Sequence, residues 1–154
     1  MTTSATKQPK FTIRTANQTL PLVRMIVDDI VVLSKQIKET RERLDYLCEG
    51  RPPGEDDEYS KELQSIQIST DEKSKLLDRF LRELLNINAI PNSADDGFVD
   101  FPAVRESEEV YLCWRQGEDE VMHWHLANED CSQRRPIDLP LIRQSGELPI
   151  SNPV

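Results

Sequence analysis

Two stretches of the sequence repeat apolar residues at alternating intervals of three and four, and no other feature constrains the fold as strongly. An average spacing of about 3.5 residues places each set on one narrow stripe of an α-helix. Two such helices can bury their stripes against each other. The stripes consist of Val23, Ile26, Ile30, Leu33, Ile37, Thr40, Leu44 and Leu47, and of Tyr59, Leu63, Ile66, Thr70, Lys73, Leu77, Phe80, Leu84 and Ile87.

The sequence between the two stripes predicts a helical hairpin. The segment Arg-Pro-Pro-Gly at 51–54 is typical of a turn. A short connection makes consecutive helices antiparallel neighbours. We therefore expect helices over 20–48 and 56–88, within a hairpin region of 12–90, with Ile26 lying near Phe80.

The helix ends are predicted from capping residues and prolines. Thr19 fits an N-cap, with Pro21 in the first turn. The preceding residues then form either a short separate helix capped by Thr12, or the start of one helix kinked at Pro21. Pro91 is expected to end the second helix.

After Pro91 the pattern becomes that of β-strands. Three runs, 98–104, 109–115 and 120–126, are rich in aromatic and β-branched residues. They predict an antiparallel sheet of about three strands packed at the base of the hairpin. The predicted fold class is α+β, with one domain over 11–137 and a β-rich segment over 97–137.

Gly117 and Glu118 fit a two-residue hairpin turn with glycine first. This turn places Cys113 opposite Met122 and Trp114 opposite Val121. Alternation along the strands then puts Cys113 on the face away from both histidines. A thiolate nucleophile activated by histidine is not expected in this register.

The composition of the chain disfavours some classes of binding partner. The net charge is −9 and the isoelectric point is about 4.8, which disfavours nucleic acid and anionic membranes. The chain contains three cysteines without a CxxC pair, and no apolar run approaches the roughly 18–20 residues that span a bilayer. We expect a cytoplasmic protein without a cofactor, with a flexible N-terminus at 1–10 and a proline-containing tail at 138–154.

The segment His123-Trp124-His125 is a candidate for metal binding. Two histidines two residues apart on a strand lie on one face and can share a metal ion. Glu129, Asp130 and Cys131 follow closely and could supply further ligands. The alternative is that one histidine lies in the core and the other at its rim.

A second candidate site involves Arg135, which is part of a basic pair in an acidic protein. If the chain folds back over the sheet after His125, Arg135 approaches Asp100, His125 or an anionic ligand. Either Arg135 forms an ion pair that holds the last segment, or Trp114, His125 and Arg135 form a pocket for an anion or carboxylate.

Several motifs of the sequence resemble the bacterial family catalogued as domain of unknown function 2203. They are FTIRTANQTLPLVR, Asp100-Phe101-Pro102, Cys113-Trp114, Gly117-Glu118, Trp124-His125 and Arg135-Pro136. The resemblance covers residues 11–137. It implies the order of elements given above and marks Asp100, Trp114, His125 and Arg135 as ligand-binding positions to test, but it implies no activity.

Two functions from different classes fit these patterns. The first is a non-enzymatic scaffold that acts through protein–protein contacts as a homodimer, since a long two-helix arm with a narrow apolar seam gains stability against another copy. The second is a small-ligand or metal-dependent enzyme that uses the sheet face around His125.

Overall fold

The computed structural model describes residues 10–50 and 58–137. It contains two helices followed by a five-stranded antiparallel sheet of order β1-β2-β3-β4-β5. The elements are α1 (Ile13–Gly50), α2 (Glu58–Asn86), β1 (Ile90–Ser93), β2 (Phe98–Arg105), β3 (Glu108–Arg115), β4 (His123–Leu126), the short 3-10 helix η2 (Cys131–Gln133) and β5 (Arg135–Pro136).

The predicted α+β class and helix-then-sheet order are confirmed, with five strands instead of three. The two additional strands, β1 and β5, form the sheet edges, where short strands containing proline are tolerated. The expectations for residues 1–9, for the turn at 51–54 and for the tail at 138–154 lie outside the described residues.

α1 is one continuous helix that passes through Pro21. It starts after Thr12, whose hydroxyl oxygen accepts a hydrogen bond from the Thr15 amide at 3.1 Å. The prediction of Thr19 as a cap is therefore wrong: its hydroxyl donates back to the Thr15 carbonyl inside the helix. Pro21 has no amide hydrogen to bond the carbonyl of Asn17, the interruption that proline causes inside a helix.

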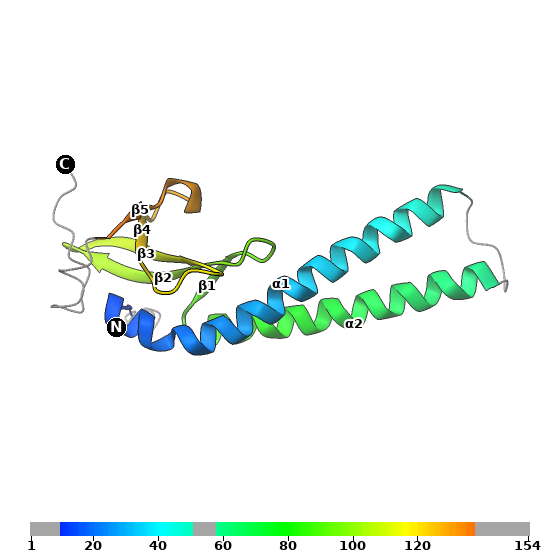
Figure 1. Cartoon of the computed structure of the whole chain (residues 1–154), viewed down its shortest axis with the longest axis horizontal. Coiled ribbons are helices and arrows are strands. Elements are labelled where there is room, and N and C mark those ends of the chain that lie inside the picture. The colour runs from blue at the N-terminus through cyan, green and yellow to red at the C-terminus, as the bar shows by residue number, and fades with distance from the viewer. Residues whose placement is uncertain (1–9, 51–57, 138–154) are drawn as a thin grey trace, which may run out of the picture.

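The two helices form the predicted antiparallel hairpin (Figure 1). Near its far end, the Tyr59 hydroxyl donates to the Leu47 carbonyl, and Arg43 lies 3.4 Å from Glu62. Nearer the sheet, Ile26 belongs to the buried core, and Phe80 packs against that core. In Figure 1 the sheet lies over one end of the hairpin, and the rest of the hairpin extends beyond it as an arm.

α2 ends before Pro91, contrary to the prediction, because a local motif stops it at Asn86. Asn88 adopts φ +67°. The Ala89 amide donates to the Leu84 carbonyl and the Asn88 amide to the Leu85 carbonyl. These two bonds are those of a Schellman motif, in which asparagine substitutes for glycine at the left-handed position. Pro91 instead lies in the edge strand β1.

The β3–β4 register differs by one residue from the prediction. Cys113 lies opposite His123, and Tyr111 lies opposite His125. The predicted two-residue turn is wrong because residues 116–122 form a longer connection, in which the Val121 amide bonds the side chain of Asn17. A shift of one residue moves side chains to the other face of the sheet relative to their partners. Cys113 therefore shares a face with both histidines.

The other face of the sheet forms the core with the helices. Phe101, Leu112 and Trp114 are buried there. They belong to one cluster with apolar residues of α1, namely Ile13, Ala16, Leu20, Val23 and Val27. The helices thus cover one face of the sheet, while the segment between β4 and β5 lies on its opposite side (Figure 1).

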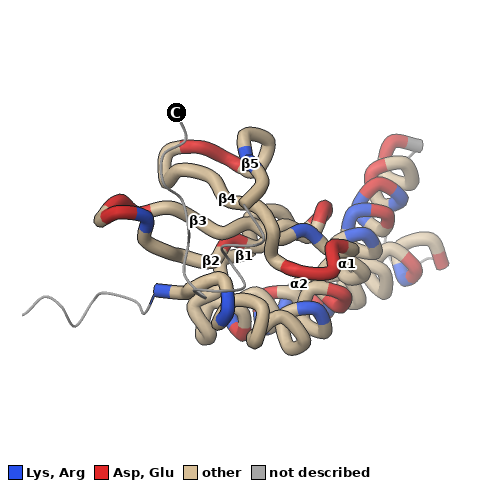
Figure 2. Tube along the Cα trace, turned by 60° about the vertical axis from the view of Figure 1, so that its left-hand side comes forward, with Lys and Arg blue, Asp and Glu red and all other residues tan. Residues whose placement is uncertain are grey.

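Charged residues of both signs are interspersed along the helices (Figure 2). The Arg43–Glu62 pair joins α1 to α2 across exposed positions, where such a pair contributes little to stability. Among the described residues, no helix combines the length and apolar composition needed to cross a membrane.

Candidate functional site

Four side chains with metal-ligating atoms meet on the sheet face that the helices leave uncovered. They are Asp100 on β2, Cys113 on β3, His125 on β4 and Cys131 at the start of η2. Their ligating atoms all lie within 4.8 Å of one another. Asp100, Cys113 and His125 are buried and Cys131 is half-buried.

Pairing of the strands produces this cluster. Asp100 lies directly opposite Cys113 in the β2–β3 ladder. His125 lies one strand further and two residues along, on the same face. The chain then turns back, and the 3-10 helix that starts at Cys131 brings a fourth side chain over the sheet.

The short distances inside the cluster link all four residues. His125 Nε2 lies 3.1 Å from Asp100 Oδ1, and Cys131 Sγ lies 3.8 Å from the same oxygen. The two sulfur atoms are 3.4 Å apart. Zinc lies about 2.3 Å from sulfur and 2.0–2.1 Å from nitrogen, so tetrahedral coordination separates ligand atoms by roughly 3.3–3.8 Å. The cluster therefore has the dimensions of a metal centre.

Further hydrogen bonds orient Asp100 and His125. Asn92 Nδ2 donates to Asp100 Oδ2 at 2.6 Å, which leaves Oδ1 directed into the cluster. His125 Nδ1 lies 2.8 Å from the backbone oxygen of Leu126. Because a carbonyl only accepts, this contact assigns the proton to Nδ1 and gives the Nε2 lone pair of a neutral ring to the cluster.

With the proton on Nδ1, two hydrogen-bond acceptors, His125 Nε2 and Asp100 Oδ1, face each other. In a neutral His125, the unprotonated Nε2 faces the Asp100 carboxylate across 3.1 Å. Two acceptors at this distance need a shared proton or a metal ion between them. The contact is therefore compatible with a metal ion bound by both side chains.

Burial strongly affects the two thiols. It raises the pKa of Cys113 far above its ordinary value, with contributions from the Cys131 hydrogen bond and the Asp100 charge. Burial and the Asp100 charge also raise the pKa of Cys131, to about 11. Both groups are thus protonated near neutral pH unless a metal ion displaces their protons, as coordination to a divalent cation does.

Arg134 lies beside the cluster but is held by another residue. Its guanidinium forms two hydrogen bonds with Glu118, of 3.1 and 2.7 Å, and Nη1 lies 4.0 Å from Cys113 Sγ. Burial alone would raise the pKa of Glu118, but the Arg134 hydrogen bonds lower it overall. Arg134 therefore adds positive charge near a site that would hold two thiolates.

His123 lies on the same face but outside the cluster. Its Nδ1 is 3.7 Å from Glu118 Oε2 and, among the described residues, has no hydrogen-bond partner. Burial and the Arg134 charge lower its pKa, partly opposed by Glu118. His125 thus belongs to the four-residue cluster and His123 does not, although the two were predicted to share a metal ion.

The four positions marked for ligand binding do not form one pocket. Asp100 and His125 lie together, as described above, but Trp114 and Arg135 lie elsewhere. Trp114 is buried on the helix-facing side of the sheet, where its indole donates to the Glu118 carbonyl. Arg135 stacks on Trp124 and pairs with Glu129 at 2.8 Å. Arg135 thus forms an ion pair, as the first of its two predicted roles requires.

Cys113 was predicted to lie on the sheet face away from both histidines, and for that reason was not expected to be a nucleophile activated by histidine. That prediction depended on the two-residue turn at Gly117, and the observed register overturns it. The available signal was chemical: the β-rich segment contains two cysteines, two histidines and three aspartates, residue types that can bind a soft divalent ion together. Cys131 was already among the possible additional ligands.

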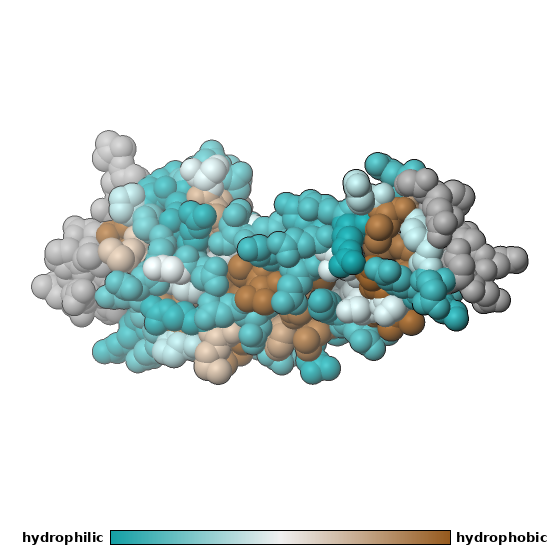
Figure 3. Space-filling model, turned by 45° about the vertical axis from the view of Figure 1, so that its right-hand side comes forward, coloured by the Kyte–Doolittle hydropathy of each residue, from teal (hydrophilic) through white to brown (hydrophobic). Residues whose placement is uncertain are grey.

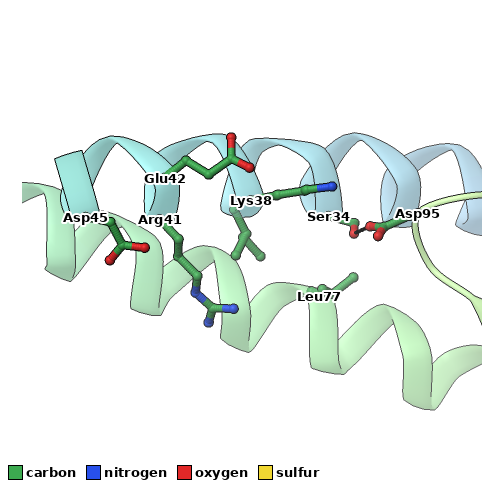
Figure 4. A pocket seen from close by; sticks show the side chains of 8 residues that line it. Ser34, Lys38, Arg41, Glu42, Asp45, Leu77 and Asp95 are labelled. Atoms are coloured by element: carbon green, nitrogen blue, oxygen red, sulfur yellow. Dashed lines mark hydrogen bonds between the residues drawn. The ribbon is translucent and has the colours of Figure 1, made fainter.

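Apart from the four-residue cluster, a groove lies between the helices and the β1–β2 turn. Its cavity volume is about 320 Å³, and it is lined by Ser34, Ile37, Lys38, Arg41, Glu42, Asp45, Leu77 and Asp95. Figure 4 shows the Ser34 hydroxyl next to Asp95, whereas the other charged side chains spread along the groove. Because most of these charges are exposed and of mixed sign, the groove is a weaker candidate than the four-residue cluster.

Comparison with known proteins gives one match. The family model described as uncharacterized conserved protein (DUF2203) matches residues 10–137, which include all of the described sheet and both helices. No curated protein and no solved structure matches the chain. The match agrees with the resemblance found from the sequence motifs.

Proposed function

The chain belongs to the DUF2203 family of uncharacterized conserved proteins, and we propose that it is a metal-binding protein whose sheet holds one thiophilic divalent cation, with zinc as the best fit. One observation carries this proposal: the ligating atoms of Asp100, Cys113, His125 and Cys131 converge within 4.8 Å. Thiolate and imidazole ligands favour zinc over the hard cations magnesium and calcium.

The composition of the site supports a structural role for the ion. Structural zinc sites have four protein ligands, whereas catalytic sites keep a position open for water or substrate. Four protein ligands are available here, and Cys113 and His125 are almost fully buried. The ion would therefore join η2 to strands β2, β3 and β4, and this reading is favoured over a metal-dependent enzyme at His125.

Zinc removal tests this proposal. Protein purified without added metal is expected to contain one zinc ion per chain by elemental analysis. Chelation should then lower the melting temperature substantially, because binding free energy at a structural zinc site adds directly to folding free energy. A metal content well below one per chain, with no stabilisation on adding zinc, would contradict the proposal.

A second function, protein–protein contact by the helical hairpin, is supported by exposed apolar side chains. Met25 is 68% exposed, Tyr46 76% and Ile68 60%, and Val32 is also exposed. In Figure 3 apolar areas interrupt the hydrophilic surface of the helical part of the molecule. A second copy of the chain would cover such residues by helix packing.

Sedimentation tests the helical hairpin as a contact surface. The chain is expected to sediment as a dimer at tens of micromolar, and Met25→Lys combined with Ile68→Lys should shift it to the monomer, since buried lysines oppose association. The matched control replaces Lys35, an exposed residue of α1, with glutamine. A clean monomer for the unmodified protein would remove this second function without affecting the metal proposal.

A further inference from the structure

The two sulfur atoms of the cluster have a second possible use. We infer that Cys113 and Cys131 form a redox pair, so that oxidation by a peroxide joins them in a disulfide and releases the bound metal. This inference rests on the proposed metal site and adds its regulation. It depends on the contact between the two sulfurs, their unequal exposure and the chain segment that holds one of them.

The sulfur atoms are already close enough for a small movement to join them. Their separation is 3.4 Å, and a disulfide bond is about 2.05 Å long. Cys113 is fixed in the middle strand β3, flanked by β2 and β4. Cys131 lies at the start of the short helix η2, which is anchored to the sheet mainly through side chains and the two-residue strand β5. Cys131 is therefore the residue whose side chain can move.

Unequal exposure assigns different roles to the two cysteines. Cys113 is completely buried, whereas Cys131 is half-buried and its neighbours Asp130 and Ser132 are exposed. A small oxidant reaches Cys131 first. Metal coordination keeps both sulfurs as thiolates, the form that reacts with peroxide.

The reaction balances with hydrogen peroxide as oxidant. The Cys131 thiolate attacks one peroxide oxygen, the O–O bond breaks, and the leaving hydroxide takes a proton to become water. The Cys113 thiolate then attacks the sulfenic sulfur of Cys131, the S–S bond forms, and the second hydroxide leaves as water. Two electrons pass from the sulfurs to the peroxide. The ion retains only Asp100 and His125 as ligands and dissociates.

The test uses zinc-loaded protein carrying Cys48→Ser, which removes the exposed third thiol on α1. Hydrogen peroxide is added, released zinc is followed with a chromogenic chelator, and peptides are mapped by mass spectrometry. We expect nearly complete zinc release, with one ion for each Cys113–Cys131 disulfide formed, and rebinding after a reductant. Retained zinc, or irreversible over-oxidation of Cys131 with Cys113 still a free thiol, would overturn the inference.

A parallel measurement separates this inference from the proposed function. Zinc content is determined before oxidation. A protein that binds no zinc at this stage contradicts the proposed metal site itself. Metal-free protein is then treated with the thiol oxidant diamide and mapped in the same way. A Cys113–Cys131 disulfide there shows that the two sulfurs pair without the ion, whereas zinc-loaded protein that keeps its zinc under peroxide overturns the redox inference and leaves the metal site standing.

Discussion

Replacing Cys113 with alanine is expected to lower the affinity for zinc by at least about 100-fold, because loss of partners outside the coordination sphere alone costs about 10–100-fold and this change removes a ligand. The sulfur lies 3.4 Å from Cys131 Sγ, and the side chain is fully buried. Water cannot easily take the vacated position. The measurement is a competition titration against a chromogenic chelator of known affinity.

Cys48→Ala provides the matched control, since Cys48 is an exposed thiol on α1. Its zinc affinity should equal that of the unmodified protein. Both variants are compared by their metal-free circular dichroism spectra, so that unfolding is not mistaken for loss of a ligand. Equal zinc affinities for the two alanine variants would show that Cys113 is not a ligand.

Gly97→Ala is expected to lower the free energy of unfolding by roughly 2–5 kcal/mol, from backbone strain and overpacking together. Gly97 has φ +73°, and an added Cβ would lie 2.7 Å from Gln116 Cβ and 3.3 Å from side-chain atoms of Val27 and Val31. This turn packs directly on α1, and the Gly97 carbonyl accepts a hydrogen bond from the Gln116 amide. The change therefore disturbs the contact between sheet and helix.

Gly117→Ala separates the two causes. Gly117 has φ +100° but no atom within 4 Å of an added Cβ. Gly117→Ala introduces backbone strain without overpacking. Gly97→Ala should therefore lower the free energy of unfolding by about 1–3 kcal/mol more than Gly117→Ala does. Urea unfolding followed by tryptophan fluorescence reports both, since both tryptophans are buried in the sheet. Equal destabilisation by the two variants would contradict the close packing at Gly97.

The helical hairpin could be predicted because its signal is repeated along two long segments. Val23, Ile26 and Ile30 are each buried as their stripe requires. The edge strands β1 and β5 could not be predicted, since each contains a proline and has only four or two residues. Their pairing depends on neighbouring strands that are distant in sequence, and short runs carry little periodic information.

Only part of the candidate site could be predicted, again because strand pairing depends on contacts distant in sequence. Asp100 and His125 were identified as positions to test, and they lie in contact. Cys113 was predicted on the wrong face of the sheet, because the register of β3 and β4 depends on contacts of the connecting loop, such as the bond from the Val121 amide to Asn17 on α1. No local pattern at Gly117 contains that information, and one residue of register decides which face Cys113 occupies.

X-ray absorption spectroscopy of the zinc-loaded protein tests the metal centre most directly. We expect two sulfur ligands at about 2.3 Å and two nitrogen or oxygen ligands at about 2.0–2.1 Å. In Cys113→Ala the spectrum of any zinc still bound should lose one sulfur. A shell made only of oxygen and nitrogen in the unmodified protein would place the ion elsewhere and show that Cys113 and Cys131 are not its ligands.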